Sequence, residues 1–128
     1  MILDSSAIIA LICNEPGADQ LLRKLGDARV IAVGAPTVAE TQLALSVKLG
    51  RDSGAIVEQL LAEMRAQVIP FGREHVSAFF AAYLRYGKGR HPARLNVGDC
   101  FTYATAKVAG MPVLFTGDDF SRTDLEAA

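Results

Sequence analysis

Four acidic residues of this chain could act together on one ligand, and they are Asp4, Glu40, Asp99 and Asp118. Asp4 and Asp118 each follow a short apolar segment of the kind that forms a buried strand, whereas Glu40 and Asp99 fall in the first turns of predicted helices. Carboxylates gathered without basic partners repel one another, and a hard divalent cation such as Mg²⁺ or Mn²⁺ relieves that repulsion. The pattern therefore predicts a metal site.

Each acid also has an ordinary structural explanation. Asp4 is a good helix N-cap, and Glu40 stands three residues after Thr37, as in a capping box. Asp99 suits the positive end of a helix dipole, and Asp118 suits a turn after Gly117. Four unrelated caps would not be expected on one side of one crevice, yet an open parallel sheet collects functional groups outside the carboxyl ends of its strands. The conjunction favours a shared site.

The chemistry of such a site is phosphodiester hydrolysis. One or two metal ions can orient a phosphodiester, lower the pKa of a bound water and stabilise the leaving oxygen. No acid occurs between Glu74 and Asp99, and the same stretch contains four basic residues, Arg85, Lys88, Arg90 and Arg94. This segment indicates either a patch that binds a polyanion or a solvated loop with ordinary surface charge, and the charge pattern alone leaves both open.

The elements that must position these residues alternate between strand and helix. The 128 residues are 51% hydrophobic with a net charge of −1, which is typical of a folded domain. Short apolar strands are predicted at 2–3, 30–33, 68–71 and 113–115. Helices are predicted at 5–13, 17–25, 36–50, 52–64, 74–86 and 97–109. We expect residues 1–128 to form a single three-layer α/β/α domain around a short central parallel sheet of about four to five strands.

The chain shows no sign of export or of membrane insertion. Its apolar opening lacks a basic segment before it and contains Asp4, and no apolar run approaches the roughly 20 residues of a membrane span. Cys13 and Cys100 are far apart and form no paired motif, so we expect free thiols. A cytoplasmic protein is predicted.

Several motifs resemble those of a known family. Residues 1–7, with Glu15-Pro16 after them, resemble the PIN-domain ribonucleases, and so does the segment 36–40. The segments 95–104 and 114–124 look like the VapC toxin branch of that family. The resemblance covers nearly the whole chain, and the combination of motifs is specific.

The resemblance implies a PIN-like fold and a Mg²⁺- or Mn²⁺-dependent endoribonuclease, the toxin of a type II toxin–antitoxin pair. It implies a VapB-like antitoxin whose C-terminal segment lies over the active-site groove, and a homodimer that forms a heterotetramer or larger assembly with it. Asp4 and Asp99 would be the principal metal ligands, with Glu40 completing the site or acting through water. Asp118 would be the fourth acid, although its neighbour Asp119 is not separated from it by the sequence. Supporting polar groups would be Ser6 and Thr116.

Other functions are open to a chain of this size. An aspartyl-phosphate phosphohydrolase usually has a second acid close after the first, where this chain has Ser5 and Ser6. A receiver-like signalling domain needs an acid after the strand at 68–71 and a late lysine, and both are missing. A catalytically inactive PIN-like module that binds RNA or protein remains an alternative. In the enzyme, recognition of RNA would fall to the loop residues Arg85, Lys88, Arg90 and Arg94, because RNA recognition favours exposed loops and bases.

Overall fold

The computed structural model describes residues 1–128 and contains a four-stranded sheet with six helices. The strands are β1 (Ile2–Leu3), β2 (Ala32–Gly34), β3 (Gln67–Ile69) and β4 (Val113–Leu114). The helices are α1 (Ser5–Ile12), α2 (Ala18–Gly26), α3 (Ala35–Leu49), α4 (Gly54–Glu63), α5 (Arg73–Tyr86) and α6 (Val97–Ala109). None of these helices combines the length and the apolar character that crossing a membrane requires.

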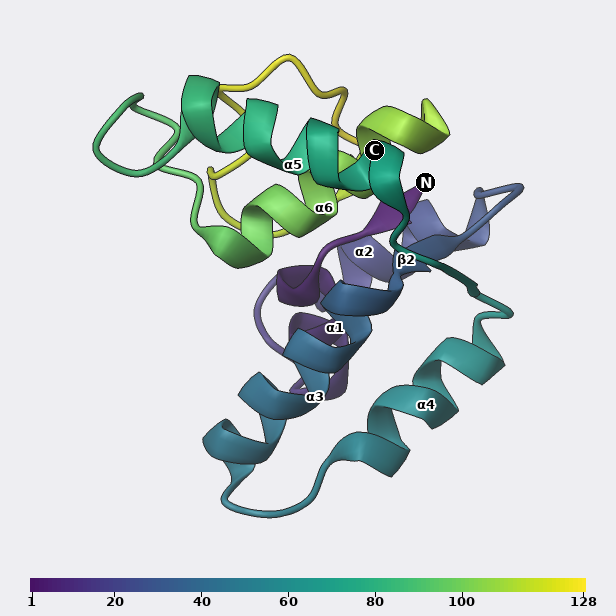
Figure 1. The fold of residues 1–128 in the computed structure, drawn as a ribbon. Helices are drawn as coiled ribbons and strands as arrows, with labels where there is room; N and C mark the ends of the chain where they lie inside the picture. The colour runs from purple at the N-terminus through teal and green to yellow at the C-terminus, as the bar shows by residue number, and fades with distance from the viewer.

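The sheet separates two hydrophobic cores. Successive side chains of a strand point to opposite faces, so Leu3 and Val33 enter the core built by α1, α2, α3 and α4. Their neighbours Ile2 and Ala32 enter the core built by α5, α6 and the C-terminal tail. Figure 1 shows α5 and α6 side by side on one side of the molecule and α1, α3 and α4 on the other. The predicted three-layer α/β/α arrangement is confirmed.

The order of the strands determines where a ligand can bind. All neighbouring strands are parallel and the order is β3-β2-β1-β4. The chain therefore moves outward from β1 to β3 and then returns to place β4 on the other side of β1. In open parallel sheets the crevice at such a reversal, outside the carboxyl ends of the strands, is the usual ligand site. Here that crevice lies where β1 and β4 end.

The edge strand differs from its prediction. The expected buried strand at 68–71 is instead β3 at Gln67–Ile69, and Val68 is 49% exposed. Since β3 pairs only with β2, it lies at the margin of the sheet, where the helices cover it incompletely. The strand expected at 30–33 likewise begins later, at Ala32, because Val30 is exposed before the sheet begins.

Helix α3 begins earlier than the capping-box interpretation required. Its first residue is Ala35, with Pro36 in the first turn, where a proline costs no backbone hydrogen bond. Thr37 is consequently inside the helix and buried, and its carbonyl oxygen accepts the Thr41 hydroxyl at 2.6 Å. The capping-box explanation for Glu40 is therefore wrong, which leaves its carboxylate without a role at the helix end.

The C-terminal tail is held against α6 and β4. Ala128 N–H donates to the Val113 carbonyl at 2.8 Å, which continues the edge of the sheet beyond β4. Asp124 accepts the Tyr103 hydroxyl at 2.7 Å and Lys107 Nζ at 2.8 Å, both from α6. Phe120 is 2% exposed and packs against Phe115. The segment that follows β4 is thus fixed in place.

Two residues of α3 test the assignment of its buried face. Leu45 is fully buried, whereas Val47 is 76% exposed. Leu45→Ala should lower the free energy of unfolding by about 2–5 kcal/mol, because a cavity replaces core packing. Val47→Ala on the same helix should change it by less than about 0.5 kcal/mol. Urea unfolding of both variants measures this, and equal losses would contradict the packing described above.

Candidate active site

Asp4 lies at the carboxyl end of β1 and caps α1. Its Oδ2 accepts the Ser6 backbone N–H at 3.0 Å and the Ser6 hydroxyl at 2.6 Å. Its Oδ1 accepts the Thr102 hydroxyl from α6 at 2.7 Å. The residue is only 3% exposed. Each carboxylate oxygen therefore has a neutral donor that fixes its orientation.

The donors to Asp4 are themselves held by neighbouring elements. Ser6 Oγ accepts the Thr116 backbone N–H at 3.1 Å, which joins the start of α1 to the end of β4. Thr102 Oγ1 lies 3.3 Å from Thr37 Oγ1 of α3. Since the Thr102 proton is given to Asp4, Thr37 is the donor in that pair. Two residues predicted as supporting, Ser6 and Thr116, thus lie beside Asp4, with Thr116 acting through its backbone.

Asp99 occupies the third position of α6. Its carboxylate accepts the Asn96 N–H at 2.9 Å, and its own N–H donates to Asn96 Oδ1 at 2.8 Å. This reciprocal cap fixes a side chain that is only 7% exposed. Burial raises the pKa of Asp99 to about 7. The bond from Asn96 opposes that rise, and the negative charges of Asp4, Asp119 and Glu40 add to it.

Glu40 projects from α3 onto the first turn of α6. A Cβ built at Gly98 would collide with both carboxylate oxygens of Glu40, so the absence of a side chain at Gly98 makes room for this acid. Burial raises the pKa of Glu40, the Ser5 hydroxyl lowers it, and the negative charge of Asp4 raises it. Glu40 therefore belongs to the same electrostatic cluster as Asp4 and Asp99.

The sequence did not separate Asp118 from its neighbour Asp119 as the fourth acid, and the structure shows the surroundings of Asp119. Although much of Asp119 is exposed, partial burial and the charges of Asp4 and Asp118 raise the pKa of its carboxyl group. Asp119 in turn raises the pKa of Asp99. The charges of Asp4, Glu40, Asp99 and Asp119 thus act within one cluster, and Asp118 lines the adjoining cavity together with Asp119.

The cluster has no cationic counterpart within the protein. The ion pairs of the structure use the acids Glu15, Glu74 and Asp124, and none of the four clustered acids. No three acidic, histidine or cysteine side chains lie close enough to hold one metal ion between them. Mg²⁺ is usually bound through one or two carboxylates, several waters and substrate phosphates, so a pair such as Asp4 and Asp99 is enough. The oxygen-only donor set fits a hard divalent cation.

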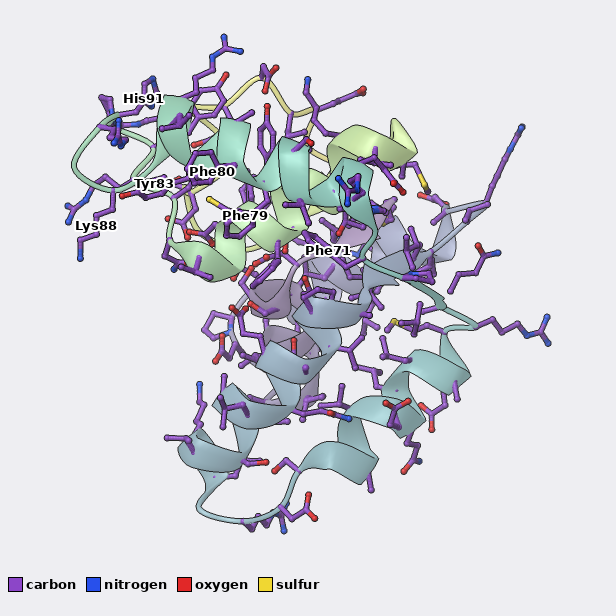
Figure 2. All side chains as sticks on the ribbon, in the orientation of Figure 1. Phe71, Phe79, Phe80, Tyr83, Lys88 and His91 are labelled. Atoms are coloured by element: carbon purple, nitrogen blue, oxygen red, sulfur yellow. The ribbon has the colours of Figure 1, made fainter.

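A cavity of about 400 Å³ adjoins the acids. Basic residues of the loop between α5 and α6 line part of it. Its lining includes Asp118 and Asp119 together with Lys88, Arg94 and Arg122. Arg90 lines the neighbouring part of the loop, and its guanidinium lies 5.2 Å from the Tyr83 ring centroid. Figure 2 shows Lys88 and His91 projecting from this loop beyond α5, near Tyr83.

The predicted basic residue Arg85 lies apart from this cavity. It contacts Asp124 at 3.7 Å and stacks 4.8 Å from the Tyr86 ring centroid. Asp124 also binds Lys107 and Tyr103, so Arg85 belongs to the set of contacts that holds the C-terminal tail. Three of the four predicted basic residues therefore line the loop cavities, and Arg85 does not.

Three residues at the site were not singled out from the sequence. Thr102 stands three positions after Asp99 and thus on the same face of α6, a spacing that could have revealed it. Gly98 precedes Asp99 directly, and a glycine inside a helix costs stability unless something approaches it closely. Arg122 follows the acidic pair by a short turn, and no sequence signal separated it from ordinary surface charge.

Comparisons with known proteins match nearly the whole chain. The family model described as "PIN domain" matches residues 1–126. A protein named Ribonuclease VapC36 from Mycobacterium tuberculosis is 46% identical over 127 residues, covering 98% of this chain and 91% of its own length. The solved structure of Mycobacterium tuberculosis VapC20, a "Sarcin-Ricin loop cleaving toxin", matches with a TM-score of 0.80 at 14% identity, covering 99% of this chain and 97% of its own.

A second solved structure is an assembly. VapBC2 from Rickettsia felis, bound to a DNA fragment from its promoter, matches with a TM-score of 0.75 at 14% identity, covering 99% of this chain and 96% of that chain. At 14% identity the two structural matches establish only a shared fold. The sequence relationship is shown by Ribonuclease VapC36, which is 46% identical.

The clustered acids make the metal-free protein sensitive to pH. The pKa of Asp99 is about 7 in the folded state against an ordinary value of 3.8, so the folded state holds the proton more tightly. The contribution of Asp99 to the free energy of unfolding is fully present below about pH 4, and it is lost as the pH rises through about 7. Asp99→Asn, which resembles the protonated side chain, should therefore unfold at a higher temperature than the unmodified protein above about pH 7, with no difference near pH 4.

Thermal unfolding in EDTA across this pH range measures the effect. The exposed carboxyl of Asp27, replaced in the same way by Asp27→Asn, is the control and should leave the profile unchanged. If the unfolding temperatures of the unmodified protein and of Asp99→Asn change in parallel with pH, ionisation of Asp99 does not destabilise the folded state.

Proposed function

The chain belongs to the PIN domain family, and from this premise we propose that it is a metal-dependent endoribonuclease, the toxin of a type II toxin–antitoxin pair. The observation that carries the proposal is the cluster of Asp4, Glu40, Asp99 and Asp119 at the sheet reversal, where no basic side chain neutralises them. The kinship with Ribonuclease VapC36 supports it.

Asp4 and Asp99 would hold Mg²⁺ or Mn²⁺ in the working enzyme. Such an ion supplies a water of lowered pKa and stabilises the charge that develops on the phosphodiester. Thr102 and Ser6 keep the Asp4 carboxylate oriented by donating to both of its oxygens, so neither oxygen needs to turn when substrate arrives. Asn96 does the same for Asp99 through its backbone N–H.

Glu40 and Asp119 complete the acidic wall on either side of this pair. Gly98 lets the Glu40 carboxylate approach the start of α6. From there Glu40 would act on the metal through water, because no three acids lie close enough to ligate one ion. Asp119 stands at the boundary between the acidic cluster and the basic cavity. Asp119 therefore shares this cavity with Lys88, Arg94 and Arg122 and forms an ion pair with none of them.

The substrate would be RNA and the regulatory partner a VapB-like antitoxin. Lys88, Arg90 and Arg94 would contact the RNA backbone, with Arg85 contributing less because Asp124 already binds it. The match to VapBC2 from Rickettsia felis supports an antitoxin partner. We expect the C-terminal segment of this antitoxin to lie over the crevice. We expect a cytoplasmic homodimer that forms a heterotetramer or larger assembly with the antitoxin.

Cleavage of total cellular RNA by antitoxin-free protein tests the activity directly. Protein with Mn²⁺ should produce discrete fragments, and EDTA should abolish them. Asp99→Asn should lower the cleavage rate by more than about 100-fold, since even partners of metal ligands are worth 10–100-fold. Asp27→Asn, remote from the cluster, should cut as well as the unmodified protein.

The outcomes separate the enzyme from its alternative. Fragments that need both Mn²⁺ and Asp99 establish the nuclease, and mapping their ends identifies the target. Full cleavage by both Asp4→Asn and Asp99→Asn would refute the assignment of these residues. Metal binding measured by titration calorimetry, together with no cleavage of any RNA, would mean that the chain is an inactive PIN-like binding module.

The two neighbouring acids after β4 should differ in their contribution. Because the charge of Asp119 acts on Asp99 and the charge of Asp4 acts on Asp119, Asp119→Asn should reduce cleavage by about 10-fold or more. Asp118→Asn should reduce it by less than about threefold, since Asp118 is exposed and is not among the charges that raise the pKa of Asp99. Initial rates at saturating Mn²⁺ compare the two, and a larger loss in Asp118→Asn would reverse the assignment.

A further inference from the structure

The cavity beside the acidic cluster presents two sets of charge that do not neutralise each other. Lys88, Arg94 and Arg122 line it together with Asp118 and Asp119. None of these five residues takes part in an ion pair. Opposite charges that share a cavity without pairing are free to bind a ligand, and the cations are available to an anion.

The wall that carries Arg122 is built to stay in place. The turn after β4 is closed by Ser121 Oγ, which donates to the Asp118 carbonyl at 2.6 Å, and by Thr123 Oγ1, which donates to the Phe120 carbonyl at 2.8 Å. Phe120, between Asp119 and Arg122, is buried against Phe115 at a ring distance of 5.2 Å. The buried ring anchors the backbone, so Arg122 and Asp119 are presented from a fixed turn.

The opposite wall is equally ordered. The ends of the loop are joined where Lys88 N–H donates to the Leu95 carbonyl at 3.0 Å and Leu95 N–H donates to the Tyr86 carbonyl at 2.9 Å. Leu95 is fully buried, and Ala93 N–H donates to His91 Nδ1 at 3.0 Å. Arg94 has a φ of 54°, a left-handed conformation that costs energy for a residue with a side chain. The backbone of this loop is therefore closed by hydrogen bonds, and the exposed Lys88 and Arg94 side chains extend from it.

We propose that this cavity is a subsite for an RNA backbone phosphate adjacent to the one that is cut, with Arg122 as a positioning residue beside Arg94 and Lys88. The inference rests on the proposed function. A guanidinium group matches phosphate through parallel N–H donors, and two arginines with one lysine suit a single phosphodiester. Asp119 borders both the acidic cluster and the cavity, so a phosphate in the cavity lies beside the reacting one.

Binding of a short fluorescein-labelled single-stranded RNA, in EDTA so that nothing is cut, tests the subsite without relying on cleavage. Arg122→Ala should weaken binding by about 5–10-fold and reduce the slope of log affinity against log salt by about 0.7, the value for one phosphate contact on a single strand. Arg122→Lys keeps the charge and should restore the slope. Arg51→Ala, at an exposed arginine remote from the cavity, is the control and should change neither quantity.

Cleavage then locates the phosphate. On an oligonucleotide that spans the mapped cut, Arg122→Ala should raise KM and leave kcat within about twofold, because binding and not chemistry is lost. A neutral methylphosphonate at the adjacent linkage should cause a similar rise in KM in the unmodified protein and no further rise in Arg122→Ala, the non-additivity of a direct contact.

The two proposals fail in different ways. Normal cleavage by Arg122→Ala with an unchanged salt slope and unchanged KM overturns the subsite and leaves the nuclease intact. An altered salt slope with no cleavage by any form of the protein keeps the phosphate contact and overturns the nuclease. Additive effects of the methylphosphonate and Arg122→Ala would place Arg122 on a different phosphate and would overturn its assignment to the adjacent one.

Discussion

Mutual repulsion between carboxylates held in one crevice is the constraint around which this molecule is organised. Asp4 and Asp99 are almost fully buried, and no lysine or arginine pairs with them. The negative charges of Asp4, Asp119 and Glu40 add to the rise in the pKa of Asp99. Such a cluster lowers the stability of the protein when ionised. Its presence is explained if the crevice exists to bind a cation and a phosphodiester, because both supply what the protein itself leaves out.

The surrounding structure offsets this cost with neutral hydrogen bonds. Thr102 reaches Asp4 from a helix far along the chain, and Ser6 joins Asp4 to the end of β4. Asn96 caps α6 and at the same time fixes Asp99. These donors orient the carboxylates without neutralising them, so the negative charge remains available.

Basic side chains lie close to the acids but form no ion pairs with them. The turn after β4 presents Asp119 and Arg122 on either side of the buried Phe120, and the loop after α5 presents Lys88 and Arg94 across the same cavity. These basic side chains form no ion pair with the acids of the cavity. A surface of this kind suits a polyanion whose reacting phosphate meets a metal while its neighbours meet basic side chains.

The sequence by itself determined the alternation of strands and helices and the parallel sheet, because apolar periodicity is a local property, and it singled out Asp4, Glu40 and Asp99 from their positions after a strand or in the first turns of predicted helices. The capping box that the sequence offered as the ordinary explanation of Glu40 is excluded only by the start of α3 at Ala35, two residues before Thr37. Only the tertiary structure revealed that the charge of Asp119 acts on Asp99, that Thr102 holds Asp4, and that Arg85 contacts Asp124 of the tail. These are contacts between residues distant in sequence, and the packing of α6 against the sheet creates them.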